Sequence, residues 1–455
     1  MKLRLSLTSE VFCLYFYIDI FERLFYNIHI TNICSAFLKV VIMRVILHSD
    51  CNCFFASVEC LYNPEIRNKP VAVCGNADER HGIVLAKNEI ARKYKVQTGE
   101  PIWQAVQKCP DLVIAKAHYD KYLRFSEMAS RIYKDYTDMI EPFGLDESWL
   151  DITASVRDFA QGKEVAEEIR RRIKYELGIT VSIGVSFNKI FAKLGSDYKK
   201  PDAVTVISPE NYKEIVYPLP AKDLLGVGRA TSKKLRTLGI YTIGDIASAP
   251  KALLRSHLGK FGEHLYAFSR GYDFSPVKHV GHINLPKSIG NSTTTARDMK
   301  TLQDASIVLT VLCDSVCRRA REQKLSAYTI GINVRDKDLY IINRQTKLTR
   351  STNLSSEVTE CAIKMLEYNY SFSKPIRSIG VTLSDFVPSY EAQQTSLFTN
   401  EHQRERLETL DHSLDVLKQR FGSFCVRPAS LLLDKELSAF SPKEEHTVHP
   451  VGIFT

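Results

Sequence analysis

The chain has 455 residues, of which 44% are hydrophobic and 25% are charged. These values exclude a disordered or low-complexity protein and predict a folded chain of about three domains. The formal net charge of +9 favours a polyanionic partner such as nucleic acid. The eleven cysteines include no Cys-x-x-Cys pair, which indicates buried free thiols in a reducing, cytoplasmic compartment rather than a zinc site.

The first 42 residues contain apolar stretches at 11–18 and 33–42. Charged residues such as Asp19, Glu22 and Arg23 interrupt them before any run reaches the roughly 18 residues that a membrane-spanning helix needs. We therefore expect no membrane segment. Met43 stands directly before the first well-patterned strand. We expect the working protein to start at Met43, with residues 1–42 as an N-terminal extension.

The next part of the chain alternates strand and helix patterns. The apolar residues before Ser49 predict a buried strand over residues 44–49 that ends at Asp50. Apolar residues at helical spacing predict an amphipathic helix over residues 163–177, which Gly178 ends. The other expected elements are strands at 71–74, 145–151, 180–185 and 203–207 and a helix at 119–139. This order fits a split β-α-β sheet.

The second half of the chain changes character twice. Residues 208–273 are expected to form short helices punctuated by glycines, followed by a connector at 276–281. An α+β unit of order β-α-β-β-α-β then follows. Its strands are expected at 287–291, 327–334, 339–343 and 376–383, and its helices at 302–322 and 355–368. After Pro388 the chain turns polar, with a last helix over residues 404–421. The predicted fold class is therefore multidomain α+β.

Three carboxylates stand at positions suited to a shared cleft. Asp50 closes a buried strand, and Asp146 and Glu147 lie in a turn between apolar neighbours. Converging acidic groups repel one another unless a cation neutralises them, and Mg²⁺ prefers carboxylate oxygens together with substrate phosphate. Two such ions about 4 Å apart would clamp the attacking and leaving oxygens of a phosphoryl transfer. By spacing alone, however, the favoured interpretation is that Asp146 is a turn residue and Glu147 a solvated charge, because an Asp-Glu pair is common in any sequence.

Three ordered motifs carry a family resemblance. The segment Asp50-Cys-Asn-Cys-Phe-Phe-Ala-Ser-Val-Glu59 resembles the opening motif of Y-family DNA polymerases, and Leu145-Asp-Glu-Ser-Trp-Leu-Asp151 resembles their second catalytic motif. A third match is Ser182-Ile-Gly-Val-Ser-Phe-Asn-Lys-Ile-Phe-Ala-Lys193 with Ser196-Asp-Tyr-Lys-Lys-Pro201. The resemblance covers residues 43–455, and the chain is similar to both the bacterial polymerase IV type and the polymerase V catalytic-subunit type.

The resemblance implies a right-hand polymerase with a ferredoxin-like palm. The palm would comprise residues 43–52 and 117–208, and the fingers residues 53–116. A helical thumb with a helix-hairpin-helix would span residues 209–275, and a linker residues 276–284. The β-α-β-β-α-β little finger would span residues 285–388, and a C-terminal tail residues 389–455.

The resemblance also implies how the metals would be held. Asp50, Asp146 and Glu147 would be the catalytic ligands of two Mg²⁺ ions. The backbone carbonyl of Cys51 would add one more ligand. Asn52 stands where polymerase IV relatives often have a second aspartate, but that position is not among the three metal carboxylates.

Four further residues are implied in nucleotide binding. Phe55 would be the steric gate that rejects a ribose 2′-OH, with Phe54 packed beside the incoming nucleotide. Arg92 and Lys200 would neutralise the triphosphate. Glu89 departs from the family, which often has a tyrosine there. Since an ionised carboxylate cannot donate to a phosphate, that contact is missing or supplied otherwise, for example by Lys87.

Other motifs predict contacts with DNA and with a protein partner. The helix-hairpin-helix has two glycines whose backbone N–H groups can meet a DNA phosphate, followed by two lysines. The little finger begins with a Lys-Ser pair, and the tail holds a pentapeptide that resembles the peptide by which bacterial polymerases bind the sliding clamp. The residues concerned are Gly226, Gly228, Lys233 and Lys234 for the thumb, Lys287 and Ser288 for the little finger, and Gln394, Leu397 and Phe398 for the clamp peptide.

The favoured hypothesis is an error-prone, translesion DNA polymerase that adds dNTPs to a primer on a DNA template. We expect it to be a monomer, to lack proofreading and to work at a bacterial nucleoid. Two alternatives stay open at this point. A nucleotide cyclase shares a palm-like sheet with paired carboxylates, and a clamp-binding DNA scaffold would have lost activity.

Overall fold

The computed structural model describes residues 44–75, 82–282, 285–391, 394 and 400–445. The expectation about Met43 and residues 1–42 falls outside these ranges. Among the helices of the described residues, none has the length and apolar character needed to cross a membrane.

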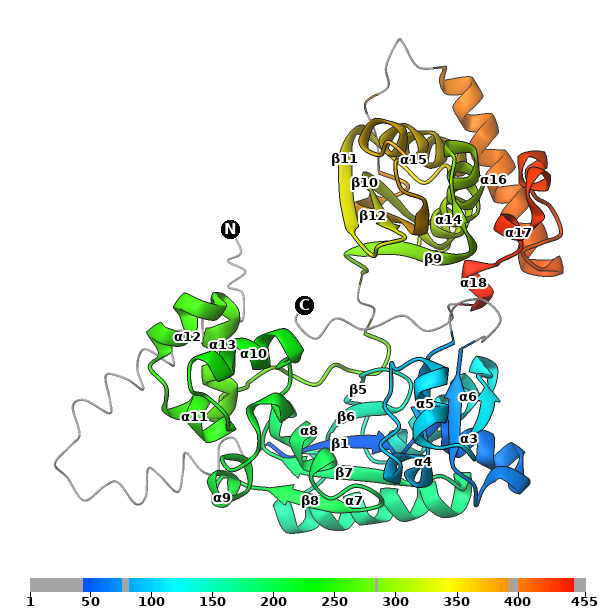
Figure 1. Cartoon of the computed structure of the whole chain (residues 1–455). Coiled ribbons are helices and arrows are strands. Elements are labelled where there is room, and N and C mark those ends of the chain that lie inside the picture. The colour runs from blue at the N-terminus through cyan, green and yellow to red at the C-terminus, as the bar shows by residue number, and fades with distance from the viewer. Residues whose placement is uncertain (1–43, 76–81, 283–284, 392–393, 395–399, 446–455) are drawn as a thin grey trace.

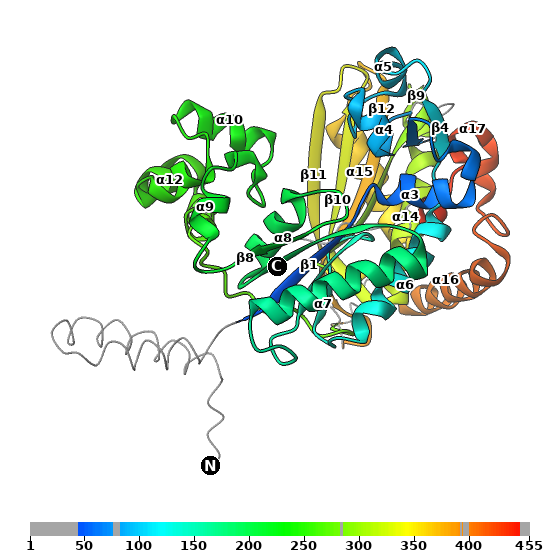
Figure 2. The same cartoon turned by 90° about the horizontal axis from the view of Figure 1, so that it is seen from below.

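A five-stranded sheet forms the base of the molecule (Figure 1). Its strand order is β5-β6-β1-β7-β8, and every neighbouring pair is antiparallel except β7 and β8. Helices α6 and α7 pack on one face and α8 on the other (Figure 2). The bounds are β1 Ile46–Cys51, β5 Ile140–Pro142, β6 Glu147–Asp151, β7 Val181–Ser186, β8 Val204–Ile207, α6 Tyr119–Lys134, α7 Phe159–Arg172 and α8 Lys189–Tyr198. A π-helical turn, η3 (Ile173–Leu177), completes the amphipathic helix predicted over residues 163–177.

The alternation along β1 decides which side chains meet α8. Val45 and Leu47 belong to the core under α6 and α7, whereas Ile46 packs with Ala192 of α8. Because successive side chains of a strand point to opposite faces, His48 and Asp50 share the α8 face with Ile46. The chain thus directs its first catalytic candidate toward α8.

Helix α8 approaches the sheet closely because Gly184 on β7 lacks a side chain. A Cβ atom at Gly184 would lie 1.9 Å from the carbonyl oxygen of Ala192 and 2.5 Å from the backbone nitrogen of Ser196. Gly195 on α8 lies opposite Gly184, and a Cβ atom at Gly195 would lie 2.9 Å from the Cα atom of Gly184. This paired contact brings the polar face of α8 within reach of β1.

A small sheet of order β3-β2-β4 and three helices stand at one end of the five-stranded sheet. Only β2 was predicted. The flanking strands have four residues each, and one residue of β3 and none of β4 is fully buried, so neither strand gives a clear apolar pattern in the sequence. The bounds are α3 Phe54–Tyr62, η1 Pro64–Ile66, β2 Val71–Cys74, β3 Val84–Lys87, α4 Glu89–Lys93, α5 Ile102–Lys108 and β4 Val113–Lys116.

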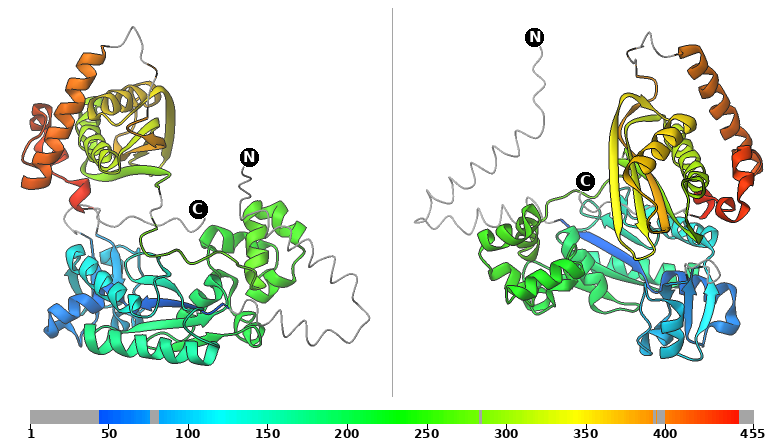
Figure 3. Two further views of the ribbon diagram at one scale, coloured as in Figure 1. Left: turned by 180° about the vertical axis from the view of Figure 1, so that it is seen from behind. Right: turned by 45° about the horizontal axis from the view of Figure 1, so that its top comes forward.

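A cluster of short helices stands at the opposite end of the sheet, as both views in Figure 3 confirm. Each of its short helices contributes a few apolar side chains to one core, in which Leu235, Ile243, Leu254 and Leu265 are fully buried. A capping box at Thr242 fixes the start of α11. The bounds are α9 Tyr212–Val216, η4 Ala221–Asp223, α10 Arg229–Thr237, α11 Ile243–Ser248, α12 Lys251–Leu258 and α13 Lys260–Ser269.

The second α+β unit has the predicted order of elements. Its sheet order is β11-β10-β12-β9, and α14 and α15 pack on one face. The strands are longer than predicted, because their polar halves lie on the open face of the sheet and lack an apolar signal. The bounds are β9 Ser288–Met299, α14 Leu302–Glu322, β10 Leu325–Asp336, β11 Ile341–Thr352, α15 Ser355–Asn369 and β12 Ile376–Pro388.

The last described part of the chain is helical and returns to this unit. It comprises α16 (Glu401–Phe421), η5 (Ala429–Leu433), α17 (Lys435–Ser438) and α18 (Pro442–Glu445). These elements, orange to red in Figures 1 and 3, lie beside α14 on the side of the unit away from its open sheet face. We call residues 401–445 the C-terminal arm.

Candidate active site at the end of β1

The backbone ladder brings two of the three predicted carboxylates together. Asp50 on β1 and Glu147 on β6 are direct partners in the antiparallel register. The backbone N–H of Cys51 donates to the carbonyl oxygen of Asp146 at 2.9 Å, which fixes the turn that enters β6. Two segments far apart in the chain therefore meet at one end of the sheet.

Two lysines from α8 and the segment after it neutralise these carboxylates. Lys193 Nζ lies 2.8 Å from both Asp50 Oδ2 and Glu147 Oε2, and Lys200 Nζ lies 2.7 Å from Asp50 Oδ2. Asp197 contacts both ammonium groups. Burial alone would lower the pKa of each lysine, but the neighbouring carboxylates outweigh it and raise the pKa of both.

The charges of Asp50 and Glu147 also affect the carboxyl group of Asp146. Burial, and then the negative charges of Glu147 and Asp50, raise the pKa of its carboxyl group to about 6. A carboxyl group with these neighbours is poorly neutralised by the protein alone. All three predicted carboxylates are therefore electrostatically coupled, although each comes from a turn or strand end that looked ordinary in the sequence.

His48 belongs to the site and was not predicted. Its ring is fully buried, with Nε2 at 3.3 Å from Glu147 Oε2 and Nδ1 at 2.9 Å from Ser196 Oγ. Burial first, and then the charge of Lys193, hold the pKa of His48 well below its usual value. The only available signal was its period-two spacing from Asp50 on the same strand face.

The donor set fits a divalent cation. One ligand atom each from His48, Asp50 and Glu147 lie within 4.8 Å of one another. Glu147 Oε2 is buried and makes no hydrogen bond among the described residues, despite its proximity to Lys193 Nζ. A carboxylate oxygen that accepts no hydrogen bond within the described ranges, such as Glu147 Oε2, can bind a hard cation such as Mg²⁺.

Asn52 has a structural role in place of the aspartate that relatives often carry. Its Nδ2 donates to Ser182 Oγ at 2.9 Å, and its Oδ1 accepts from the backbone N–H of Asp202 at 2.9 Å. An amide can donate and accept in this way, whereas an ionised carboxylate can only accept. Asn52 thus ties β7 to the segment that carries Lys200.

The two adjacent phenylalanines have different surroundings. Phe54 is buried in the core, while Phe55 is half-buried and stacks on Tyr122, with ring centroids 4.2 Å apart and an interplanar angle of 9°. The hydroxyl of Tyr122 donates to Glu59 Oε1 at 2.6 Å. Phe55 is therefore held in one orientation by a ring that is itself anchored to a buried carboxylate.

Arg92 is not free in this structure. Its guanidinium lies 2.8 Å from Glu89 Oε1, and Glu89 also accepts from the Cys53 thiol at 3.2 Å. Burial, reinforced by the hydrogen bond to Glu89, raises the pKa of Cys53 to about 12. Lys87, which the sequence analysis considered as a substitute phosphate contact, donates to Thr98 Oγ1 at 3.3 Å.

The predicted DNA contacts lie away from this cluster and are solvent-accessible. Gly226 has φ of 88°, Gly228 is the N-cap of α10, and Lys233 and Lys234 are exposed on that helix. Lys287 and Ser288 are exposed at the start of β9. Gln394 is exposed, but Leu397 and Phe398 fall outside the described residues. These assignments of DNA and clamp contacts stay predictions.

Comparisons with known families match three parts of the chain. The impB/mucB/samB family matches residues 49–197, and the C-terminal domain of that family matches residues 286–397. The thumb domain described for DNA polymerase-iota matches residues 222–273. These segments correspond to the carboxylate site, the second α+β unit and the cluster of short helices.

Individual proteins match over most of their length. DNA polymerase IV of Acetivibrio thermocellus is 49% identical over 396 residues, which cover 87% of this chain and 99% of the relative. DNA polymerase IV 1 of Bacillus subtilis is 34% identical over 395 residues, or 86% and 94% of the two chains. A solved Y-family DNA polymerase chimera aligns with a TM-score of 0.67 at 26% identity, covering 75% of this chain and 99% of that one.

The α+β units, the helical thumb and the carboxylate site define a polymerase of the right-hand type, as the sequence predicted. The chain belongs to the Y family of translesion, DNA-directed DNA polymerases, in the group of the bacterial DNA polymerase IV enzymes. Of the two types that the sequence resembled, the curated relatives favour polymerase IV.

Proposed function

We propose that this chain extends a primer on a DNA template by nucleotidyl transfer at Asp50, Asp146 and Glu147. The observation that carries the proposal is the direct pairing of Asp50 with Glu147, neutralised by Lys193 and Lys200. A cluster of buried carboxylates balanced by ammonium groups is suited to exchange these for divalent cations and a polyphosphate substrate.

Two Mg²⁺ ions held by the three carboxylates and the Cys51 carbonyl would stabilise the negative charge that develops on the reacting phosphate. The chain itself supplies positioning and charge rather than a covalent intermediate. Lys200 could move from Asp50 to the triphosphate, because its Nζ contacts Asp50 while its side chain is partly exposed. Arg92 would join it once Glu89 releases its guanidinium.

Phe55 is proposed as the steric gate against ribonucleotides, with Phe54 packed behind it in the core. The ring of Phe55 is half-buried and stacked, so its edge is fixed rather than free to rotate. A fixed aromatic edge discriminates against one extra hydroxyl better than a mobile side chain does.

The domain boundaries follow as part of the proposal. The palm comprises residues 43–52 and 117–208, the fingers 53–116, the thumb 209–275, the linker 276–284 and the little finger 285–388. The remainder, 389–455, would be a tail that binds the sliding clamp through Gln394, Leu397 and Phe398. Duplex DNA would contact Gly226, Gly228, Lys233 and Lys234 of the thumb and Lys287 and Ser288 of the little finger. The proposed enzyme is monomeric, lacks proofreading and acts at the nucleoid.

Primer extension tests the catalytic assignment. The parent chain should extend a labelled primer–template with Mg²⁺ and dNTPs, whereas Asp146→Ala should reduce extension to background. Asp138→Ala is the matched control, because Asp138 is exposed and its carboxylate pairs with His279 at the surface. Equal extension by Asp146→Ala and Asp138→Ala would reject the proposed ligands, and a cyclic nucleotide as product would favour the cyclase alternative.

Two further assays separate the remaining roles. Phe55→Ala should raise ribonucleotide incorporation relative to the parent, and unchanged sugar selectivity would remove the gate role. Binding of the full chain to a purified sliding clamp should be lost in Phe398→Ala. Retained clamp binding in that variant would reject the peptide assignment without affecting the catalytic one.

A further inference from the structure

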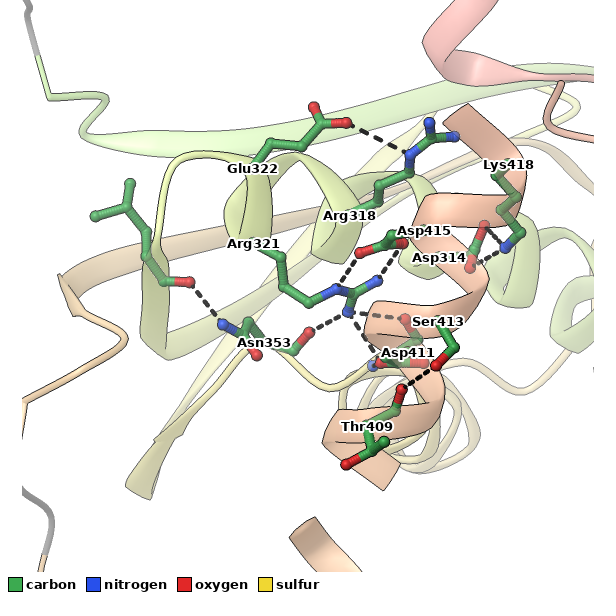
Figure 4. Close-up of polar contacts among 12 residues, drawn as sticks. Asp314, Arg318, Arg321, Glu322, Asn353, Thr409, Asp411, Ser413, Asp415 and Lys418 are labelled. Carbon is green, nitrogen blue, oxygen red and sulfur yellow. Dashed lines mark hydrogen bonds and ion pairs between the residues drawn. The ribbon is translucent and has the colours of Figure 1, made fainter. Parts of the chain in front are cut away.

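The C-terminal arm is attached to the little finger by buried ion pairs. Arg321 of α14 forms a bidentate ion pair with Asp415, in which Nε and Nη2 donate to the two carboxylate oxygens at 2.6 and 2.9 Å. Its Nη1 donates to Asp411 Oδ2 at 2.9 Å (Figure 4). Lys418 of α16 is almost fully buried and donates to both oxygens of Asp314 at 2.7 and 2.8 Å. These contacts fix α16 along α14.

A cavity of about 30 Å³ lies between α14 and the arm, next to the Lys418 ion pair. This volume exceeds the roughly 10–15 Å³ that one water molecule needs. The charged residues that line it are Asp314 and Arg318 from α14 and Lys418, Arg427 and Lys443 from the arm. Ser315 of α14 also lines it. Apolar residues such as Leu431 and Phe440 complete the lining, so charged groups from both α14 and the arm face a cavity of mixed character.

Two buried polar atoms at this cavity make no hydrogen bond among the described residues. They are Ser315 Oγ and Arg318 Nε. Both residues are more than nine-tenths buried. Arg318 Nε lies 3.4 Å from Glu322 Oε1, which also pairs with Lys443 (Figure 4 shows the first of these contacts). Buried polar groups are nearly always satisfied, so a missing partner is indicated.

The charges at the cavity do not balance among the described side chains. Four cations, Arg318, Lys418, Arg427 and Lys443, meet two carboxylates, Asp314 and Glu322. Burial lowers the pKa of Arg427, which indicates that its charge is poorly compensated. The excess cations are Arg427 and Lys443, which are only partly buried. An anion between them would supply attraction that water does not supply.

We propose that this cavity is a binding site for a small oxyanion such as inorganic phosphate or sulfate. Arg318 and Ser315 donate to the anion from α14, and Arg427 and Lys443 face it from the arm. The anion bridges the two partners and locks the arm onto the little finger. This site is separate from the nucleotide site and does not depend on the proposed catalytic residues.

Calorimetric titration with inorganic phosphate tests the proposal. Ionic strength is held constant with sodium chloride, and the full chain carries Lys200→Ala so that the proposed triphosphate site does not contribute. One phosphate should bind per chain. Arg318→Gln should weaken binding about tenfold or more, because a charged hydrogen bond is lost. Arg335→Gln is the matched control, since Arg335 is exposed on β10 of the same unit.

A second variant and a second readout keep the test decisive. Ser315→Ala retains all charges and should weaken phosphate binding several-fold even if Arg318→Gln disturbs folding. Phosphate should also slow proteolytic cleavage within the arm at constant ionic strength. Absence of phosphate binding, binding unaffected by both variants, or an arm cleaved equally fast with and without phosphate would overturn the proposal.

Discussion

Replacement of Lys193 by methionine should reveal how tightly the carboxylates depend on a cation. The side chain of Lys193 is 13% exposed, and those of Asp50 and Glu147 are 6% and 20% exposed. Removing one partner of a buried ion pair leaves an uncompensated charge and costs roughly 3–5 kcal/mol. Methionine preserves the length and apolar stem of the side chain, so that mainly the charge is lost.

The lower end of that range applies here. Lys200 still contacts Asp50 in the variant, so that chiefly Glu147 loses its cation, and we expect a loss of about 3 kcal/mol. Lys174→Met is the matched control. Lys174 pairs with Asp202 at 2.7 Å but is 42% exposed, and an exposed pair contributes only about 0.2–1 kcal/mol.

Unfolding in urea, followed by tryptophan fluorescence, measures this loss. Trp149 is buried on β6 beside Glu147 and reports on the five-stranded sheet. Trp103 is 60% exposed on α5, so the Trp103→Phe background isolates the signal of Trp149. Each variant is unfolded with a chelator and again with Mg²⁺.

Mg²⁺ should stabilise Lys193→Met more than it stabilises the parent. In the parent, a metal ion must displace an ammonium group from Asp50 and Glu147, whereas the variant lacks this competitor. A loss in Lys193→Met no larger than in Lys174→Met would refute the electrostatic reasoning. Equal stabilisation of parent and variant by Mg²⁺ would refute the competition between Lys193 and the metal ion, and stabilisation of neither would refute the metal site.

Three further predictions concern packing, thiol reactivity and pH. Gly184→Ala should destabilise the sheet by about 3 kcal/mol in urea unfolding, because its Cβ would lie 1.9 Å from a carbonyl oxygen of α8; an unchanged midpoint would contradict the close approach. Since the pKa of Cys53 is about 12, iodoacetamide should modify it far more slowly than the exposed Cys425, and Glu89→Gln should speed this reaction; equal rates would be inconsistent with the Glu89 contact. The backbone N–H group of Leu437 in α17 lowers the pKa of Asp434 in the folded chain. The ionised Asp434 carboxylate therefore stabilises the folded chain fully above the unfolded pKa of ~4, and this stabilisation is lost as the pH falls below that value. Asp434→Asn should therefore lose less stability than the parent between about pH 5 and 3, and parallel curves would disprove this linkage.

Local patterns in the sequence were sufficient to predict several elements. The helix over residues 302–322 was predicted with its observed bounds, because the spacing of its apolar residues is a local property. The ordered motifs also led to the polymerase family. The short strands β3 and β4 escaped prediction, since their pairing with β2 is decided by neighbours elsewhere in the chain.

The family, the order of the elements and the three candidate carboxylates could be predicted from the sequence. The surroundings of those carboxylates could not, because they depend on the tertiary fold. Lys193 reaches Asp50 across 143 positions of sequence, and Arg321 meets Asp415 across 94 positions. No local period encodes such contacts, because they depend on which strands pair and how closely a helix approaches the sheet. For the same reason, the ammonium groups at the carboxylates and the cation-lined cavity beneath the arm appear only in the folded chain.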